Sequence, residues 1–444
     1  MENSTACVPS TGIVTKDDEP PLTGKRCSGS TPNHSPCESI SPTLRALAEV
    51  PEWKDWQWQL RNRIRSMSRL TECFPKLKIT GETLKAAEKF PQAITPYYAA
   101  LVRKMDLSDP ILQMSVPQGR ELCNPDFLTE DPLAEETHMP IPGLVHRYPD
   151  RALFLATSAC AVYCRHCTRK RVTGARESRV SASRLKQTVE YLHAHPGIKD
   201  VVVSGGDPLT MSDSAIEAII SALRSVPSVE VIRIGTRTPV TLPYRITDEL
   251  VERLRKYHPI WVNTHFNHPC EITPESAEAC RRLADAGFPL GNQSVLLRGI
   301  NDNHSIMEEL LRGLIRMRVR PYYLFQCDLV AGVEHFRTPL SRGIEIMEHL
   351  RGRLSGLAIP TFVVDLPDGC GKVPVLPDYV VSKTLTNTVF RNSTGLHANY
   401  PEPVAGEPDS CGSEITSEPG TGDTTFGSAP RNPELRRRKQ CRSC

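Results

Sequence analysis

Three cysteines stand within eight residues of this chain, and their spacing indicates an iron–sulfur cluster. The pattern is Cys160-x-x-x-Cys164-x-x-Cys167, and it follows an apolar run, residues 153–156, that is typical of a strand ending in a loop. A [4Fe–4S] cluster normally takes four thiolates, so three neighbouring cysteines leave one iron open to a ligand from outside the protein. The alternative is a structural zinc site completed by His166, but such sites favour paired Cys-x-x-Cys units and a closed shell of ligands.

Polar residues also follow other predicted strands. The run Ser204, Gly205, Gly206 and Asp207 comes directly after one of them, where two glycines let the backbone approach a small molecule and the aspartate supplies an acceptor. A plain glycine-rich turn would have the same composition. His265 and Gln293 also end predicted strands. Each could contribute to the same site or could be a buried polar group that is hydrogen-bonded within the core.

One lysine, Lys372, stands on a glycine-containing loop, residues 368–371, directly after a predicted strand. A lysine in such a place is commonly a solvated charge, but a partly desolvated lysine can form a Schiff base with an aldehyde such as pyridoxal phosphate (PLP). Upstream, Arg147, Tyr148 and Arg151 offer two guanidinium groups and a phenol, which suit a phosphate and a pyridine ring. Surface ion pairing is the alternative for these arginines.

Alternating strands and helices must position these groups. Short β-rich runs predict strands at 152–156, 201–204, 229–234, 260–263, 291–296, 322–326 and 361–364. Amphipathic stretches predict helices between them at 185–193, 216–223, 274–286 and 306–316. Repeated βα units imply a parallel sheet, either doubly wound or curled into an open partial barrel. In a barrel the chemistry lies at the carboxyl ends of the strands, where the polar residues above fall.

Composition excludes several classes of protein. The chain has 444 residues, of which 39% are hydrophobic and 24% charged, with a net charge of +3. That balance gives no electrostatic case for a nucleic-acid partner. The sequence has neither a run long enough to span a membrane nor the apolar core of a secretion signal, so we expect a cytoplasmic protein with no membrane association. Most of its 15 cysteines should then be free thiols.

The domain organisation follows from the same patterns. Residues 1–42 and 403–444 are rich in Ser, Thr, Pro and charge, which predicts disordered tails. Residues 43–145 predict an N-terminal helical region whose tryptophans pack against the main domain. Residues 146–365 predict the partial barrel, and residues 366–402 the loop of Lys372 with a C-terminal segment.

Taken together, these motifs closely resemble the lysine 2,3-aminomutase family of radical S-adenosylmethionine (SAM) enzymes. The resemblance runs from Trp53 to Pro403, and the motifs that carry it lie at residues 55–59, 93–98, 160–167, 233–239 and 318–323. It implies an open partial (β/α) barrel of radical SAM type. It also implies an isomerase that uses a [4Fe–4S] cluster, SAM and PLP to exchange the α-amino group of an amino acid with a hydrogen on C3.

The resemblance assigns a role to each matching residue. The cluster ligands would be Cys160, Cys164 and Cys167. The residues that line the SAM site would be Ser204, Gly205, Gly206, Asp207, His265 and Gln293. Lys372 would form the internal aldimine with PLP, whose pocket would include Arg147, Tyr148 and Arg151. Arg169 would pair with the substrate carboxylate, and the ammonium of the substrate side chain would be held by Asp328 and Asp365.

The substrate implied is a free basic amino acid, lysine before arginine, whose guanidinium the same two carboxylates could bind bidentately. A mutase acting on a lysine within a translation factor and a non-catalytic cluster-binding regulator are further alternatives. The chain departs from the family at Phe325, where a tyrosine is expected, and at Asp368 and Cys370, where glycines are expected. We also expect a homo-oligomer and an electron donor such as flavodoxin or ferredoxin.

The familiar clostridial-type enzyme joins its subunits through zinc bound by a cysteine-rich C-terminal segment. Here only Cys411 precedes the late pair Cys441 and Cys444, and the turn at 300–303 lacks the expected cysteine. These departures argue against an interfacial zinc site.

Overall fold

The structure, a computed structural model, describes residues 42–174 and 177–403. The chain divides into two compact units, Met1–Asp378 and Tyr379–Cys444. The predicted tails lie almost entirely outside the described residues, as do Cys411, Cys441 and Cys444. The structure therefore does not test the predictions made for the tails or for these cysteines.

The first unit is built on one sheet, which has nine strands within the described residues. The strands are β1 (Leu144–Tyr148), β2 (Arg151–Thr157), β3 (Asp200–Gly205), β4 (Val231–Gly235), β5 (Ile260–Thr264), β6 (Leu290–Leu296), β7 (Arg320–Gln326), β8 (Thr361–Leu366) and β9 (Gly371–Pro374). They lie side by side in chain order. The strands from β2 to β8 run parallel, whereas β1 and β9 pair antiparallel at the two edges.

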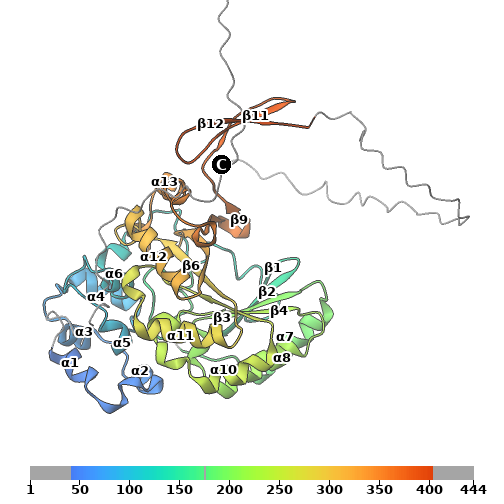
Figure 1. Cartoon of the computed structure of the whole chain (residues 1–444). Coiled ribbons are helices and arrows are strands. Elements are labelled where there is room, and N and C mark those ends of the chain that lie inside the picture. The colour runs from blue at the N-terminus through green and yellow to red at the C-terminus, as the bar shows by residue number, and fades with distance from the viewer. Residues whose placement is uncertain (1–41, 175–176, 404–444) are drawn as a thin grey trace, which may run out of the picture. The chain divides into compact units, whose positions relative to one another are not determined.

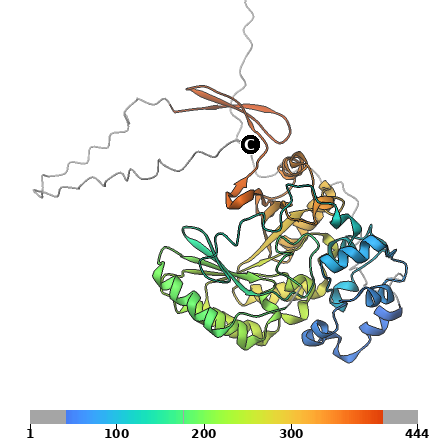
Figure 2. The same ribbon diagram turned by 180° about the vertical axis from the view of Figure 1, so that it is seen from behind.

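Strand order decides between the two architectures that the sequence left open. A doubly wound sheet reverses its order at a switch point, but here the order never reverses, so right-handed crossovers place successive helices on the same face. Figures 1 and 2 show the result, a curled, open half-barrel with its helices along the outer side. These helices are α7 (Ala182–Ala194), α8 (Asp213–Arg224), α9 (Thr238–Thr241), α10 (Asp248–Leu254), α11 (Pro274–Asp285), α12 (His304–Arg316) and α13 (Leu340–Leu350).

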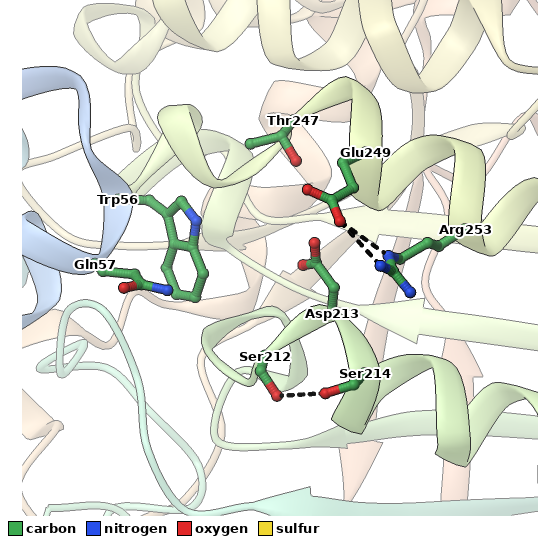
Figure 3. A pocket seen from close by; sticks show the side chains of 8 residues that line it. All are labelled: Trp56, Gln57, Ser212, Asp213, Ser214, Thr247, Glu249 and Arg253. Carbon is green, nitrogen blue, oxygen red and sulfur yellow. Dashed lines mark hydrogen bonds and ion pairs between the residues drawn. The ribbon is translucent and has the colours of Figure 1, made fainter.

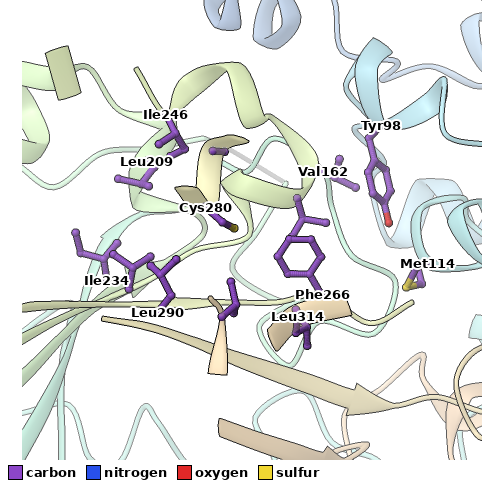
Figure 4. Close-up of a cluster of buried hydrophobic side chains, with 14 of the residues drawn as sticks. Tyr98, Met114, Val162, Leu209, Ile234, Ile246, Phe266, Cys280, Leu290 and Leu314 are labelled. Atoms are coloured by element: carbon purple, nitrogen blue, oxygen red, sulfur yellow. The ribbon is translucent and has the colours of Figure 1, made fainter. Parts of the chain in front are cut away.

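Burial alternates along the inner strands because successive side chains point to opposite faces of the sheet. In β3, Val201 and Val203 are fully buried, whereas the alternate residues Val202 and Ser204 are partly exposed. The buried positions face apolar side chains of the surrounding helices, such as Leu314 of α12. Figure 4 shows part of this core. The other face is left free to line the inside of the half-barrel.

All seven strands predicted from the sequence are confirmed, with ends shifted by at most two residues. The helix predicted at 274–286 is α11, where Thr273 caps the first turn by accepting from the Ser276 amide and Pro274 occupies the first helical position. Gly287 ends it with a φ of +86°. The edge strands β1 and β9 were not predicted.

The N-terminal region is helical, as expected, but its helices are short. They are α1 (Pro42–Ala48), α2 (Trp56–Arg61), α3 (Met67–Cys73), α4 (Gly81–Lys89), α5 (Pro96–Ala99) and α6 (Pro110–Ser115). The tryptophans do pack on the main domain: the Arg245 guanidinium lies 4.4 Å from the Trp56 ring centroid, and Trp53 contacts the core. Among the described residues, no helix is long and apolar enough to cross a membrane.

Single-turn 3-10 helices connect many of these elements: η1 (Pro51–Lys54), η2 (Gly119–Leu122), η3 (Pro208–Thr210), η4 (Pro243–Arg245), η5 (Arg255–Tyr257), η6 (Pro269–Glu271), η7 (Glu334–Phe336), η8 (Gly356–Ala358) and η9 (Pro367–Gly369). The second unit contains a separate antiparallel sheet, β10 (Val380–Lys383), β11 (Asn387–Arg391) and β12 (His397–Pro401).

Candidate active site

The cysteine loop follows β2 and is anchored from its middle by a buried ion pair. Arg165 lies between the second and third cysteines, and its guanidinium donates to both oxygens of Glu121 at 3.0 and 2.6 Å. Both side chains are almost fully buried, at 1% and 0% exposure. Lys170 adds a second cation at 2.9 Å from Glu121. Because these charges are paired and desolvated, the loop is held firmly against the N-terminal region.

The start of the same loop is fixed by a second arginine. Arg63 donates to the Cys160 carbonyl at 2.6 Å and pairs with Glu177 at 2.7 Å. Glu177 also accepts the hydroxyl hydrogen bond of Tyr163. The three cysteines themselves are partly exposed, free thiols. In the part of the chain that the structure describes, no three His, Cys, Asp or Glu side chains are arranged to hold one metal ion. A cubane does not require that arrangement, since each thiolate binds a different iron.

The Gly-Gly-Asp segment crosses the beginning of the cysteine loop at close range. Gly205 has a φ of +120°, and a Cβ on it would lie 2.3 Å from the Thr157 carbonyl oxygen. The Asp207 amide donates to the Ala159 carbonyl at 2.7 Å. The glycines are therefore required by this backbone crossing, a reason that the sequence did not reveal. Their predicted contact with SAM stays a prediction.

Asp207 is buried and ties the end of β3 to the end of β4. Its carboxylate accepts from the Thr236 hydroxyl at 2.7 Å, the Arg237 amide at 2.7 Å and the Leu209 amide at 3.1 Å. Burial raises its pKa, although these hydrogen bonds oppose the rise. The acceptor expected to face SAM is thus largely used within the protein.

His265 directly follows β5, as predicted, whereas Gln293, which was predicted to end a strand, lies in the middle of the adjacent strand β6. Burial lowers the pKa of His265 to about 4, helped by the nearby positive charge of Arg237 and opposed by a hydrogen bond with the backbone of Gln293. His265 is therefore neutral at physiological pH and has one donor and one acceptor nitrogen.

Lys372 lies in β9, opposite Asp365 of β8 in the antiparallel register. Its Nζ is 2.8 Å from Asp365 Oδ1 and 5.3 Å from the centroid of the Phe325 ring. Arg147 of β1 also approaches, with Nη2 at 3.7 Å from the same carboxylate oxygen. Side chains from the two ends of the strand order therefore meet across the open side of the half-barrel.

The other residues predicted for PLP gather at this point. Arg147 donates to the Tyr148 hydroxyl at 3.0 Å, and the Arg151 guanidinium lies 4.1 Å from the Tyr148 ring centroid. A Cβ on Gly371, next to Lys372, would lie 3.6 Å from that hydroxyl. The structure thus brings a lysine amine, two guanidinium groups and a phenol together. This donor set fits the aldehyde, phosphate and ring of PLP.

The residues predicted to hold the substrate lie close to Lys372. Asp328 accepts from the Thr168 hydroxyl at 2.7 Å through Oδ2, whereas its buried Oδ1 has no hydrogen-bond partner among the described residues. Burial raises the pKa of Asp328 to about 6, and the negative charge of Asp365 contributes to the rise. Lys372 and Arg169 oppose it. Asp328 is therefore within electrostatic range of Asp365, Lys372 and Arg169.

Arg169 forms an ion pair with Glu135, which was not predicted from the sequence. Its Nε donates to both oxygens of Glu135 at 3.0 Å, and its Nη2 donates at 2.6 Å. Glu135 thus occupies one edge of the guanidinium, and the edge that contains Nη1 makes no hydrogen bond with a described residue. A planar guanidinium can bind a second carboxylate along such an edge.

The structure also contains a surface hollow away from these groups, shown in Figure 3. It is lined by Trp56, Gln57, Ser212, Asp213, Ser214, Thr247, Glu249 and Arg253. None of these residues was predicted to take part in chemistry.

Comparison with known proteins agrees with this geometry. Residues 347–427 match the family model described as lysine-2,3-aminomutase, and residues 154–311 match the radical SAM superfamily. L-lysine 2,3-aminomutase of Clostridium subterminale is 51% identical over 80% of this chain and 85% of its own length. This chain belongs to the lysine 2,3-aminomutase family. It is therefore an isomerase of the radical SAM class, and membership implies SAM and a [4Fe–4S] cluster.

Other members of the lysine 2,3-aminomutase family differ in the substrate that their names state. L-lysine 2,3-aminomutase of Bacillus subtilis is 48% identical over 80% of this chain and 76% of its own length. Glutamate 2,3-aminomutase of Clostridioides difficile is 46% identical over 78% of this chain and 82% of its own length. Sequence identity to this chain hardly differs among these relatives, so it does not distinguish a lysine substrate from a glutamate substrate.

Proposed function

We propose that this enzyme moves the α-amino group of a free basic L-amino acid to C3, converting L-lysine to β-lysine. The observation that carries the proposal is the pair of carboxylates near Lys372. Asp328 has a buried oxygen without a protein partner, and Asp365 already contacts a primary ammonium, that of Lys372, at 2.8 Å. A lysine side chain that ends in the same chemical group would satisfy both.

The charges at the two ends of the substrate would be matched by opposite charges of the protein. Arg169 would bind the α-carboxylate with the edge that Glu135 leaves free. Asp328 and Asp365 would bind the cationic end. A glutamate side chain would instead place an anion against two carboxylates, and burying such an unpaired charge is costly. This argument favours a basic amino acid over glutamate, despite the similarity to a glutamate enzyme.

The cofactors would be held by separate segments. Cys160, Cys164 and Cys167 would bind the cluster, and the SAM site would be lined by Ser204, Gly205, Gly206, Asp207, His265 and Gln293. With an electron from a protein such as flavodoxin or ferredoxin, the cluster and SAM would supply the one-electron chemistry that activates C3. The chain's own part is to hold C3 in position for that chemistry and to exclude water.

PLP would be bound by Lys372, with Arg147, Tyr148 and Arg151 around its phosphate and ring. The group supplies a delocalised link to the substrate nitrogen, which makes the nitrogen able to migrate. While the Lys372 amine holds PLP, it would not pair with Asp365 as an ammonium, and the Asp365 carboxylate would be available to an arriving substrate. Transfer of PLP to the substrate nitrogen would release the Lys372 amine again.

The two-carboxylate argument can be tested with isosteric variants. Asp328→Asn and Asp365→Asn should each lower kcat/KM for lysine by about two to four orders of magnitude, because removing one partner of a buried charge pair costs about 3–5 kcal/mol. Asp368→Asn, an exposed aspartate a few residues from Lys372, serves as the matched control and should leave kcat/KM nearly unchanged. If both variants kept the full activity toward lysine, the proposed substrate site would be wrong.

A further inference from the structure

Arg237 reaches from the end of β4 to one of the three cysteines. Its Nη1 donates to Cys164 Sγ at 2.9 Å. The residue is only 8% exposed, so this hydrogen bond is largely shielded from water. Arg237 belongs to the 233–239 motif, to which the sequence assigned no chemical role.

The guanidinium has little freedom to leave the sulfur, because its other nitrogens are also bound. Nη2 pairs with Glu271 and donates to the Tyr98 hydroxyl at 2.9 Å, and Nε donates to the His265 carbonyl at 3.2 Å. Glu271 is itself fully buried and accepts from Tyr98 at 2.7 Å. This set of bonds, which we call the Arg237 network, fixes both the position and the orientation of the Nη1 donor.

We propose that Arg237 is a positioning residue that raises the reduction potential of the cluster by donating a hydrogen bond to the Cys164 sulfur. The proposal rests on Cys164 being a cluster ligand, as in the proposed function. Reduction adds one electron to the cluster and moves no atom. The added negative charge increases the electron density on the sulfur ligands, so a fixed N–H donor stabilises the reduced state more than the oxidised state. The negative charge of Glu271 offsets the positive charge of Arg237. We therefore attribute the effect on the cluster to the hydrogen bond that Nη1 donates to the Cys164 sulfur, and not to a net charge.

The decisive variant removes the donor without changing net charge. Arg237→Met combined with Glu271→Gln eliminates both members of the ion pair, and the glutamine can still accept from the Asn267 amide that Glu271 binds. We expect the equilibrium constant for one-electron reduction of the cluster to fall at least tenfold, which corresponds to a potential about 59 mV more negative. Arg233→Gln is the matched control. Arg233 lies in β4, four residues before Arg237, but it pairs with Asp200, and its loss should leave the potential unchanged.

The measurement is a redox titration of the full-length, cluster-loaded protein, followed by electron paramagnetic resonance without substrate. Iron content and the shape of the reduced signal are recorded for each variant, since a merely structural loss would reduce the amount of cluster rather than shift its potential. A double variant that holds about four irons per chain and titrates at the wild-type potential would overturn the proposal.

If the double variant fails to load iron, Tyr98→Phe decides instead. It keeps the charge pair and removes one anchor of the guanidinium, so a smaller shift in the same direction is expected, and no shift would refute the proposal. Failure of the proposed function is detected separately. If Cys164→Ser retained the cluster with all its spectroscopic properties, Cys164 would not be a ligand, and the premise itself would be wrong.

Discussion

Asp328→Asn should make the substrate-free enzyme more stable while it removes a group that the proposed reaction needs. The reason is that an ionised Asp328 carboxylate is unfavourable in the folded protein, because it is buried and its Oδ1 has no hydrogen-bond partner among the described residues. The pKa of Asp328 is raised from 3.8 to about 6. At about 1.36 kcal/mol per pKa unit, keeping this group ionised in the folded protein costs about 3 kcal/mol at pH 7.5. Asparagine has nearly the same shape, and its amide oxygen can still accept from Thr168.

The effect must depend on pH in a defined direction. The folded chain binds the Asp328 proton more tightly than the unfolded chain, so stability falls as pH rises from 3.8 through about 6. The advantage of the variant should therefore be about 3 kcal/mol at pH 7.5 and about 1.5 kcal/mol at pH 5, and it should disappear well below pH 4.

The assay is thermal unfolding of wild type and variant without substrate, at equal cofactor loading, at pH 7.5 and pH 5. A gain of a few degrees in Tm is expected at pH 7.5, with a smaller gain at pH 5. Asp368→Asn, on an exposed loop, is the control and should change stability by less than about 0.5 kcal/mol. Asp365→Asn should be destabilising, because Asp365 pairs with Lys372. An Asp328 variant that is no more stable than wild type at pH 7.5 would refute the reasoning.

Three further outcomes follow from the same contacts. Lys372→Ala should remove the PLP adduct that borohydride traps, while about four irons per chain remain; peptide mapping that finds the adduct on another lysine would contradict this. Glu121→Gln should destabilise the protein by about 3–5 kcal/mol in chemical unfolding, because it leaves Arg165 and Lys170 in the interior without an anion, and an unchanged midpoint would disprove it. KM for lysine should rise as pH falls through about 6, since protonated Asp328 cannot pair with a cation; a flat profile would speak against Asp328 as a substrate ligand.

The sheet could be predicted because its central strands have a local signature. Buried parallel strands are apolar runs, and Val201 to Val203 is such a run. The edge strands have no such signature: β1 contains His146, Arg147 and Tyr148, and β9 is only four residues long. Chain order of the strands, which decided for a half-barrel, is a property of the whole fold and cannot be read from any one segment.

The site residues that are close together in the sequence could be predicted, whereas those that are distant in the sequence could not. Cys160, Cys164 and Cys167 are close in sequence, so their spacing reveals them. The carboxylates that hold the site arginines were missed because they are distant in the chain: Glu121 lies 44 residues from Arg165, and Glu271 lies 34 from Arg237. For Arg237, its position two residues after the end of β4 was the one available signal.

The most direct test of the proposed function is a competition between amino acids. Reconstituted enzyme with SAM, PLP and a reductant is given equal lysine, arginine and glutamate under anaerobic conditions. Each β-amino acid has the same mass as its substrate, so the products are separated from the substrates by chromatography before they are identified by mass. β-Lysine as the main product is the predicted result, and mainly β-arginine would keep the two-carboxylate site but change the substrate. Preferred formation of β-glutamate would contradict the central claim that Asp328 and Asp365 select a cationic side chain.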